Sequence, residues 1–145
     1  GTPWDPHCSH FHSCSHRNKH VPHNALRDAF VSIAKRAVPH SVVATDQPGL
    51  GHSRLWTAIS NKRPDVLLLH QSHIGGHLLG DFYCPAFSTH LPWCRSLEHF
   101  WQKAEDHKRA EYNVALPHRA LPLVINQFGA LGPALQEQLL TFHSR

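Results

Sequence analysis

The chain has 145 residues, of which 41% are hydrophobic and 17% charged. This size and balance suit one globular domain and exclude a fully disordered protein. No apolar run approaches the roughly 18 residues needed to cross a bilayer, so no membrane partner is expected. Fourteen Lys and Arg against ten Asp and Glu give a formal charge of +4, which suits a polyanionic partner such as nucleic acid.

The first residues and the cysteines indicate the cellular compartment to expect for the protein. No charged segment followed by an apolar run stands near Gly1, so we expect an intracellular, non-secreted protein. The chain contains no methionine, and we interpret it as a processed product or, preferably, as a segment of a longer reading frame. In a reducing compartment Cys8, Cys14, Cys84 and Cys94 are expected to be thiols or metal ligands rather than disulfides.

Residues 1–23 mix Pro, Ser and Cys with six histidines and show no apolar period. We expect an irregular lead-in there, followed by one domain over residues 24–145. A tetrahedral Zn²⁺ could be held by Cys8, Cys14 and two histidines, preferably His16 and His20, from the set His10, His12, His16, His20 and His23. Five residues separate the two cysteines, more than the two to four typical of a zinc knuckle, which favours the alternative of a His-rich segment that binds metal only adventitiously.

Regular structure is expected from Asn24 onward. Asn24 is a plausible N-cap and Pro39 a plausible stop for a helix, whose apolar stripe would be Leu26, Phe30, Ile33 and Ala37. A β-branched run predicts a strand over Ser41–Thr45. Gln47–Asn61 carries turn residues and reads as a loop.

The second half of the chain predicts a hairpin, two helices and a further strand. Apolar runs at Pro64–His70 and Leu78–Cys84 flank Gly75 and Gly76, which is typical of a hairpin. Ser96 would open a helix, a strand is predicted over Leu121–Asn126, and Pro133 would start the last helix. The inward face of the helix after Ser96 would hold Leu97, Phe100 or Trp101, Ala104, Lys108 and Tyr112.

Lys108 is the most informative residue in this pattern. It lies four residues after Ala104 and four before Tyr112, on the stripe that should face the sheet, where an unpaired ammonium group would be costly. Either a negatively charged partner waits for it there, or its stem follows the apolar face while its amine reaches water.

Two acids on the hairpin strands could be that partner. Asp65 opens the first strand and Asp81 lies within the second. Two neighbouring carboxylates in a half-buried sheet repel each other unless a cation sits between them. Mg²⁺ held by Asp65 and Asp81, with Lys108 near the attacking water, would make a site for phosphodiester hydrolysis. Taken singly, each aspartate is better explained as a residue that caps a turn or follows a bend.

Several short runs occur in a suggestive order: His23-Asn24-Ala25-Leu26-Arg27-Asp28, Arg63-Pro64-Asp65-Val66-Leu67-Leu68, Asp81, Ala104-x-x-x-Lys108-x-x-x-Tyr112, Leu121-Pro122-Leu123-Val124, Phe128-Gly129 and Gly132-Pro133. Together they resemble the C-terminal region of non-LTR retrotransposon reverse transcriptases, over roughly residues 20–142. The resemblance implies an α/β, restriction-endonuclease-like fold with an α-β-β-β-α-β core, a mixed central sheet and a C-terminal helix. It also implies nicking of target DNA with Mg²⁺ or Mn²⁺, a nuclear location, an upstream polymerase domain, and element RNA as a further partner.

The resemblance also assigns residues. It implies catalytic roles for Asp65, Asp81, Lys108 and Tyr112, and maps a further acidic metal ligand loosely to Asp46. The chain departs from the pattern in three places. Tyr83 stands two residues beyond Asp81, where a restriction-type site usually has lysine; Asp46 is in poor register; and only fragments of a zinc knuckle precede His23.

Three interpretations therefore remain open. The first is a metal-dependent endonuclease. The second is a nucleic-acid-binding module whose catalytic residues have decayed, and the third is a non-functional fragment of an old element. In the second, phosphate would be contacted by Arg27, Lys35, Arg36, Arg63, Lys103 and Arg109.

Overall fold

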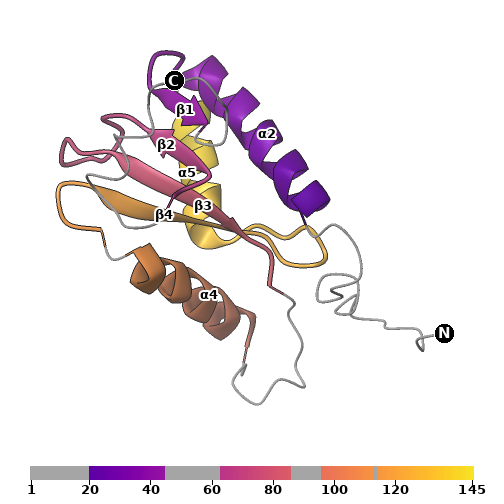
Figure 1. Ribbon diagram of the computed structural model, residues 1–145. Helices are drawn as coiled ribbons and strands as arrows, with labels where there is room; N and C mark the ends of the chain where they lie inside the picture. The colour runs from indigo at the N-terminus through magenta and orange to yellow at the C-terminus, as the bar shows by residue number, and fades with distance from the viewer. Residues whose placement is uncertain (1–19, 45–62, 86–95, 113) are drawn as a thin grey trace.

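The computed structural model describes residues 20–44, 63–85, 96–112 and 114–145. In these ranges three helices pack against one four-stranded sheet (Figure 1). The elements are α2 (His20–Ala37), β1 (Val42–Ala44), β2 (Val66–Leu68), β3 (Leu78–Tyr83), α4 (Leu97–Tyr112), β4 (Arg119–Val124) and α5 (Pro133–His143). The predicted order of elements and the mixed α/β class are confirmed.

The sheet is mixed, as expected. Its strands lie in the order β1-β2-β3-β4; β2 is antiparallel to both β1 and β3, whereas β3 and β4 are parallel. A parallel pair needs a crossover connection, and α4 supplies it. Helices α2 and α5 cover one face of the sheet and α4 covers the other (Figure 1).

Because both faces are covered, the central strands are buried on both sides. Between the sheet and helices α2 and α5 lies a large cluster that includes Phe30, Phe82 and Phe142. Between the sheet and α4 lie smaller clusters around Phe100 and Tyr112 of that helix. Within the described ranges no helix combines the length and apolar character needed to cross a membrane.

The start of α2 and its buried face differ from the prediction. The helix begins at His20 rather than at an Asn24 cap, and Ile33 is 44% exposed whereas Ala34 is fully buried. Phe30, Ala34 and Val38 are also spaced by four residues, so the sequence offers two neighbouring apolar stripes. Leu26, Phe30 and Ala37 pack on the core as predicted, whereas Ala34 and Val38 are buried there in place of Ile33.

Turn chemistry locates the other elements well. Ser72 and Gly76 close the hairpin turn between β2 and β3, and a side chain at Gly76 would collide with the Pro117 carbonyl. The Ser96 hydroxyl accepts a hydrogen bond of 3.1 Å from the His99 N–H, which caps α4. Pro133 is the first residue of α5. The strands are shorter than predicted or shifted; β4 begins at Arg119 instead of Leu121, because pairing with Leu78 starts there.

One buried acid joins two helices and was not foreseen. Glu105, in α4, is 6% exposed. Its carboxylate accepts a hydrogen bond of 3.0 Å from the N–H of Ala134, in the first turn of α5. A carboxylate satisfies the unpaired N–H groups of a helix N-terminus and interacts favourably with the helix dipole. Glu105 therefore links the helix on one face of the sheet to the helix on the other.

Candidate active site

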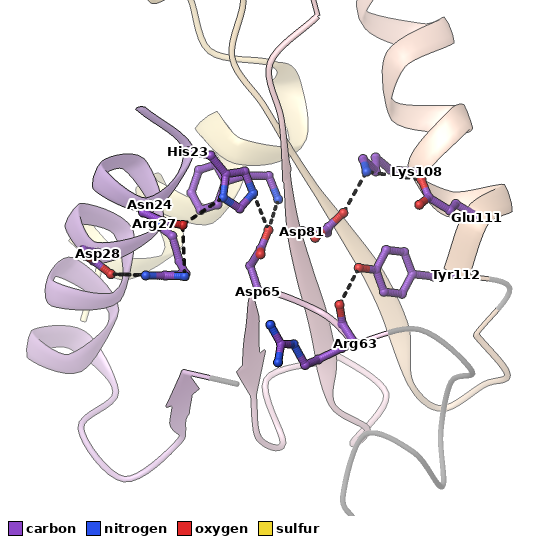
Figure 2. A network of polar contacts seen from close by, with 11 residues as sticks. His23, Asn24, Arg27, Asp28, Arg63, Asp65, Asp81, Lys108, Glu111 and Tyr112 are labelled. Atoms are coloured by element: carbon purple, nitrogen blue, oxygen red, sulfur yellow. Dashed lines mark hydrogen bonds and ion pairs between the residues drawn. The ribbon is translucent and has the colours of Figure 1, made fainter. Parts of the chain in front are cut away.

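The structure brings Asp65, Asp81, Lys108 and Tyr112 together at one end of the hairpin (Figure 2). Asp65 lies just before β2, and its N–H donates a hydrogen bond of 2.9 Å to the Gly80 carbonyl, which sets it beside Asp81 in β3. Lys108 and Tyr112 reach the same place from α4. Residues far apart along the chain thus meet as the sequence predicted.

Lys108 faces the sheet and is paired there. Its amine lies 2.8 Å from the Asp81 carboxylate, and the two side chains are only 12% and 14% exposed. The same amine lies 3.2 Å from the Glu111 carboxylate and 5.1 Å from the centre of the Tyr83 ring. Lys108 therefore has the negatively charged partner that its position requires, and the alternative of an amine that reaches water is wrong.

Asp65 is held from the other side, by α2 and β3. Its Oδ2 atom accepts a hydrogen bond of 2.8 Å from the Phe82 N–H and lies 3.1 Å from Nε2 of His23. His23 belongs to the first part of α2, in a segment expected to be irregular. It was named only among the possible zinc ligands, and its contact with Asp65 was not predicted, although it begins the His-Asn-x-x-Arg-Asp run.

The two carboxyl groups titrate differently. Burial favours the neutral form of Asp65, but hydrogen bonds from His23, Asp81 and the Phe82 backbone outweigh it and lower the pKa of Asp65 to about 2. Burial and the adjacent Asp65 raise the pKa of Asp81 to about 6, against the pull of Lys108. Two titratable groups with pKa values pushed apart by their surroundings are typical of catalytic sites.

The cations beside them respond in the expected direction. The hydrogen bond to Asp65 raises the pKa of His23 even though burial lowers it. Burial also favours the neutral amine of Lys108, but the hydrogen bonds and charges of Asp81 and Glu111 raise its pKa above the usual range. Lys108 therefore carries its charge at any neutral pH.

Tyr112 is the most enclosed member of the group, with 3% exposure. Its hydroxyl donates a hydrogen bond of 3.1 Å to the Arg63 carbonyl, which ties the chain entering β2 to the end of α4. Burial and the neighbouring Asp81 raise the pKa of Tyr112 far above its ordinary value. The side chain thus stays protonated and supports the position of Asp65.

The donor set suits a small, hard divalent cation. Among the described residues, no group of three or more His, Cys, Asp or Glu side chains could hold a metal ion. Mg²⁺, however, is usually bound by one or two carboxylates together with water and substrate phosphates. The electrostatic conflict between Asp65 and Asp81, visible in the raised pKa of Asp81, is one that such a cation would relieve.

Several predicted ligands cannot be placed. Asp46, Cys8, Cys14 and His16 lie outside the described residues, and His20 is within α2 but its side chain is not described. Of the cysteines, Cys84 is within a described range, where it is a free thiol; burial raises its pKa. Comparison with known proteins gave no match to a family model, to a curated protein or to a solved structure.

Proposed function

We propose that this chain is a metal-dependent endonuclease domain that cleaves DNA by phosphodiester hydrolysis. One observation carries the proposal: the Lys108 amine lies 2.8 Å from Asp81 on the side of the sheet covered by α4, with the carboxylate of Asp65 beside it. The α-β-β-β-α-β order and the mixed sheet support the finer assignment to the restriction-endonuclease-like fold.

The two aspartates are the residues that would hold Mg²⁺ or Mn²⁺. Such a cation lowers the pKa of water and neutralises charge on a phosphate. The contacts of Asp65 with Phe82 and His23 fix the orientation of its carboxylate before any ligand arrives. Preorganised ligands of this kind hold a catalytic group in position without reorganisation during the reaction.

Lys108 has a different part in this scheme. Because its pKa is raised, it cannot accept a proton from water at neutral pH and does not act as a general base. Its ammonium group can donate hydrogen bonds to the attacking water and to the phosphate oxygens, which gain charge in the transition state. Glu111 and Asp81 hold the amine in place, and Tyr112 acts as a positioning residue.

From the resemblance to non-LTR retrotransposon reverse transcriptases we further propose that this activity is one step in a longer sequence. Nicking of a chromosomal target would leave a 3′ hydroxyl that primes synthesis by an upstream polymerase domain, with element RNA as the template. Target DNA in the nucleus and the Mg²⁺ or Mn²⁺ ion are parts of the same proposal.

A nicking assay on supercoiled plasmid DNA tests the proposal. Asp81→Asn keeps the volume of the side chain but removes a charged ligand, so the rate with Mg²⁺ or Mn²⁺ should fall by roughly 10²- to 10³-fold. Glu98→Gln changes an exposed acid at the start of the same helix and should nick at the rate of the parent. Far-ultraviolet circular dichroism would confirm that both variants are folded.

The other interpretations make different predictions. A binding module with decayed catalytic residues would bind DNA with an affinity that falls steeply with salt, and would cleave it with neither metal. Equal nicking by the parent and Asp81→Asn would show that any cleavage arises elsewhere and would remove the assignment.

A further inference from the structure

A basic groove runs along the edge of the sheet formed by β4. It has a volume of about 650 Å³ and lies between the end of α4, the turn after β2 and one flank of α5. Its basic lining residues are Arg109, Arg119, Arg145, His70, His73 and His118. Glu137 is the one acidic residue that lines it within the described part of the chain, so the groove favours an anion.

The edge of β4 itself is unsuited to pairing with another strand. The N–H groups of Arg119 and Ile125 donate to β3 or to the residue before it. The N–H groups of Ala120 and Val124, and the nitrogen of Pro122 between them, therefore face the outer side. Proline has no N–H, and its place in the middle of this outer row blocks a continuous ladder. The carbonyl of Val124 is already taken by the N–H of Gly132. Addition of a peptide strand to this edge is therefore disfavoured. A ligand in the groove would be bound by side chains rather than by the backbone of β4.

Those side chains present donors. Arg119 and Arg145 are exposed, whereas Arg109 is held near Asp106 and Glu105 at 3.2 and 3.5 Å. The N–H of His77 donates to Nδ1 of His118 over 2.9 Å. A backbone N–H can only donate, so this ring nitrogen is unprotonated and neutral His118 carries its proton on Nε2. His118 thus offers a hydrogen-bond donor even without a charge.

The groove is close to the candidate active site. Arg119 pairs with Leu78 across β3 and β4, and Pro122 pairs with Asp81. The separation of three residues corresponds to about 10 Å along the strand. In a nucleic acid strand with about 3.4 Å of axial rise per nucleotide, this spans roughly three nucleotide steps.

We propose that the groove binds the phosphate backbone of the DNA strand that is cleaved, a few nucleotides from the scissile bond. This rests on the proposed endonuclease function. Its arginines contribute phosphate contacts, which position the strand without reading its sequence. The apolar residues beside them, such as Leu116 and Val114, supply surface for sugars and bases.

Binding can be measured apart from cleavage. Fluorescence anisotropy with a labelled single-stranded 20-mer, in EDTA, would compare the parent chain with the double variant Arg119→Glu and Arg145→Glu. We expect the dissociation constant to rise at least roughly tenfold, and the slope of log affinity against log salt to become shallower by about 0.7 for each lost contact. The control is Ala29→Glu with Ser32→Glu, two exposed positions of α2, which lowers the net charge by as much as the neutral groove pair described next and should bind like the parent. The double variant Arg119→Gln and Arg145→Gln removes the same charges without adding carboxylates, so it tests whether the loss of the arginines alone weakens binding.

The outcomes separate the two proposals. Weakened binding in both groove variants but not in the control supports the groove, and it does so even if no metal ever yields a nick. Parental binding by the groove variants overturns it, whether or not the parent chain nicks plasmid DNA. Displacement of the 20-mer by poly-glutamate at equal charge concentration, with the same dependence on Arg119, would also overturn it, since the groove would then take acidic peptides.

Discussion

The two ends of the β2–β3 hairpin use histidine in opposite ways. At the end that holds Asp65 and Asp81, His23 lies 3.1 Å from a carboxylate and its pKa is raised. At the turn end, the ring of His77 packs against those of His70 and His118, with centroids 4.7 and 4.8 Å away. Burial lowers the pKa of His77, and repulsion from the charges of His118 and His70 lowers it further. Histidine thus pairs with a carboxylate at one end of the hairpin, where its protonated form is favoured. At the other end it accepts hydrogen bonds as a neutral ring.

The two ends therefore differ in the protonation states that their contacts favour. The acidic end collects opposite charges that a metal or a substrate could rearrange. At the histidine end, backbone N–H groups of His70 and His77 donate to the ring nitrogens of His77 and His118 over 3.0 and 2.9 Å, so each accepting ring must stay unprotonated on that atom. Four predictions test this contrast, from the largest effect to the smallest.

Replacement of Lys108 with methionine should have the largest effect, because it leaves Asp65 and Asp81 side by side without their amine. Breaking a buried pair costs about 3 kcal/mol of unfolding free energy, and we expect a loss of about that size at pH 8. At pH 5 the loss should be smaller, since Asp81, with a pKa of about 6, can take up a proton instead. Urea denaturation at both pH values measures it.

Lys103→Met is the matched control for that experiment. Lys103 is exposed on the same helix, and its replacement should change the unfolding free energy by less than about 0.5 kcal/mol. A Lys108→Met variant as stable as this control at pH 8 would contradict an obligatory charge pair at the acidic end.

Binding of Mn²⁺ should depend on pH through Asp81. Below pH about 6 a proton competes with the metal for this carboxylate, so the apparent affinity should fall by about tenfold per pH unit; above it the affinity should level off. Isothermal titration calorimetry between pH 5 and 8 measures the affinity without reference to cleavage. In Asp81→Asn the affinity should be weak and the break near pH 6 should vanish; an unchanged break would assign it to another group.

The sequence predicted local features of the acidic end and missed those that depend on tertiary contacts. The spacing of Ala104, Lys108 and Tyr112 fixes a helix face from 3.6-residue periodicity alone, and the Gly75-Gly76 turn predicts the antiparallel pairing that brings Asp81 near Asp65. The register itself was not predictable, because a one-residue slip would satisfy the same apolar run on a sheet covered on both faces.

His23 and Glu105 show where the sequence is silent. Each is defined by a partner more than 25 positions away, Asp65 and the N–H of Ala134, and no periodic pattern marks such contacts. Ile33 was wrongly predicted on the buried face of α2 for a related reason: Ile33 and Ala34 lie on adjacent stripes, and packing against other elements decides between them.

His23→Gln should have a moderate effect that grows towards acid pH. Because the pKa of His23 is raised in the folded protein, its stabilising contribution is present below about pH 6.5 and is lost as pH rises through the folded pKa. We expect the variant to be less stable than the parent by about 1 kcal/mol at pH 5.5 and by little at pH 8.5. His73→Gln, at an exposed position in the hairpin turn, should show no such trend; equal losses at both pH values would mean that His23 acts only by packing.

His77→Asn should have the smallest effect, with the opposite pH dependence. The folded protein disfavours the proton on His77, so its contribution to stability is present above about pH 6.5 and is lost as the pH falls below that value. A protonated Nδ1 would face the N–H of His70, donor against donor, whereas the amide oxygen of asparagine remains an acceptor at every pH. Water screens this half-buried ring, so the effect is small. Between pH 7 and 5.5 the free energy of unfolding of the parent should fall by about 0.5 kcal/mol more than that of the variant. Thermal unfolding across this range would detect the difference. If the unfolding temperatures of the two proteins changed in parallel with pH, protonation of His77 would not affect stability.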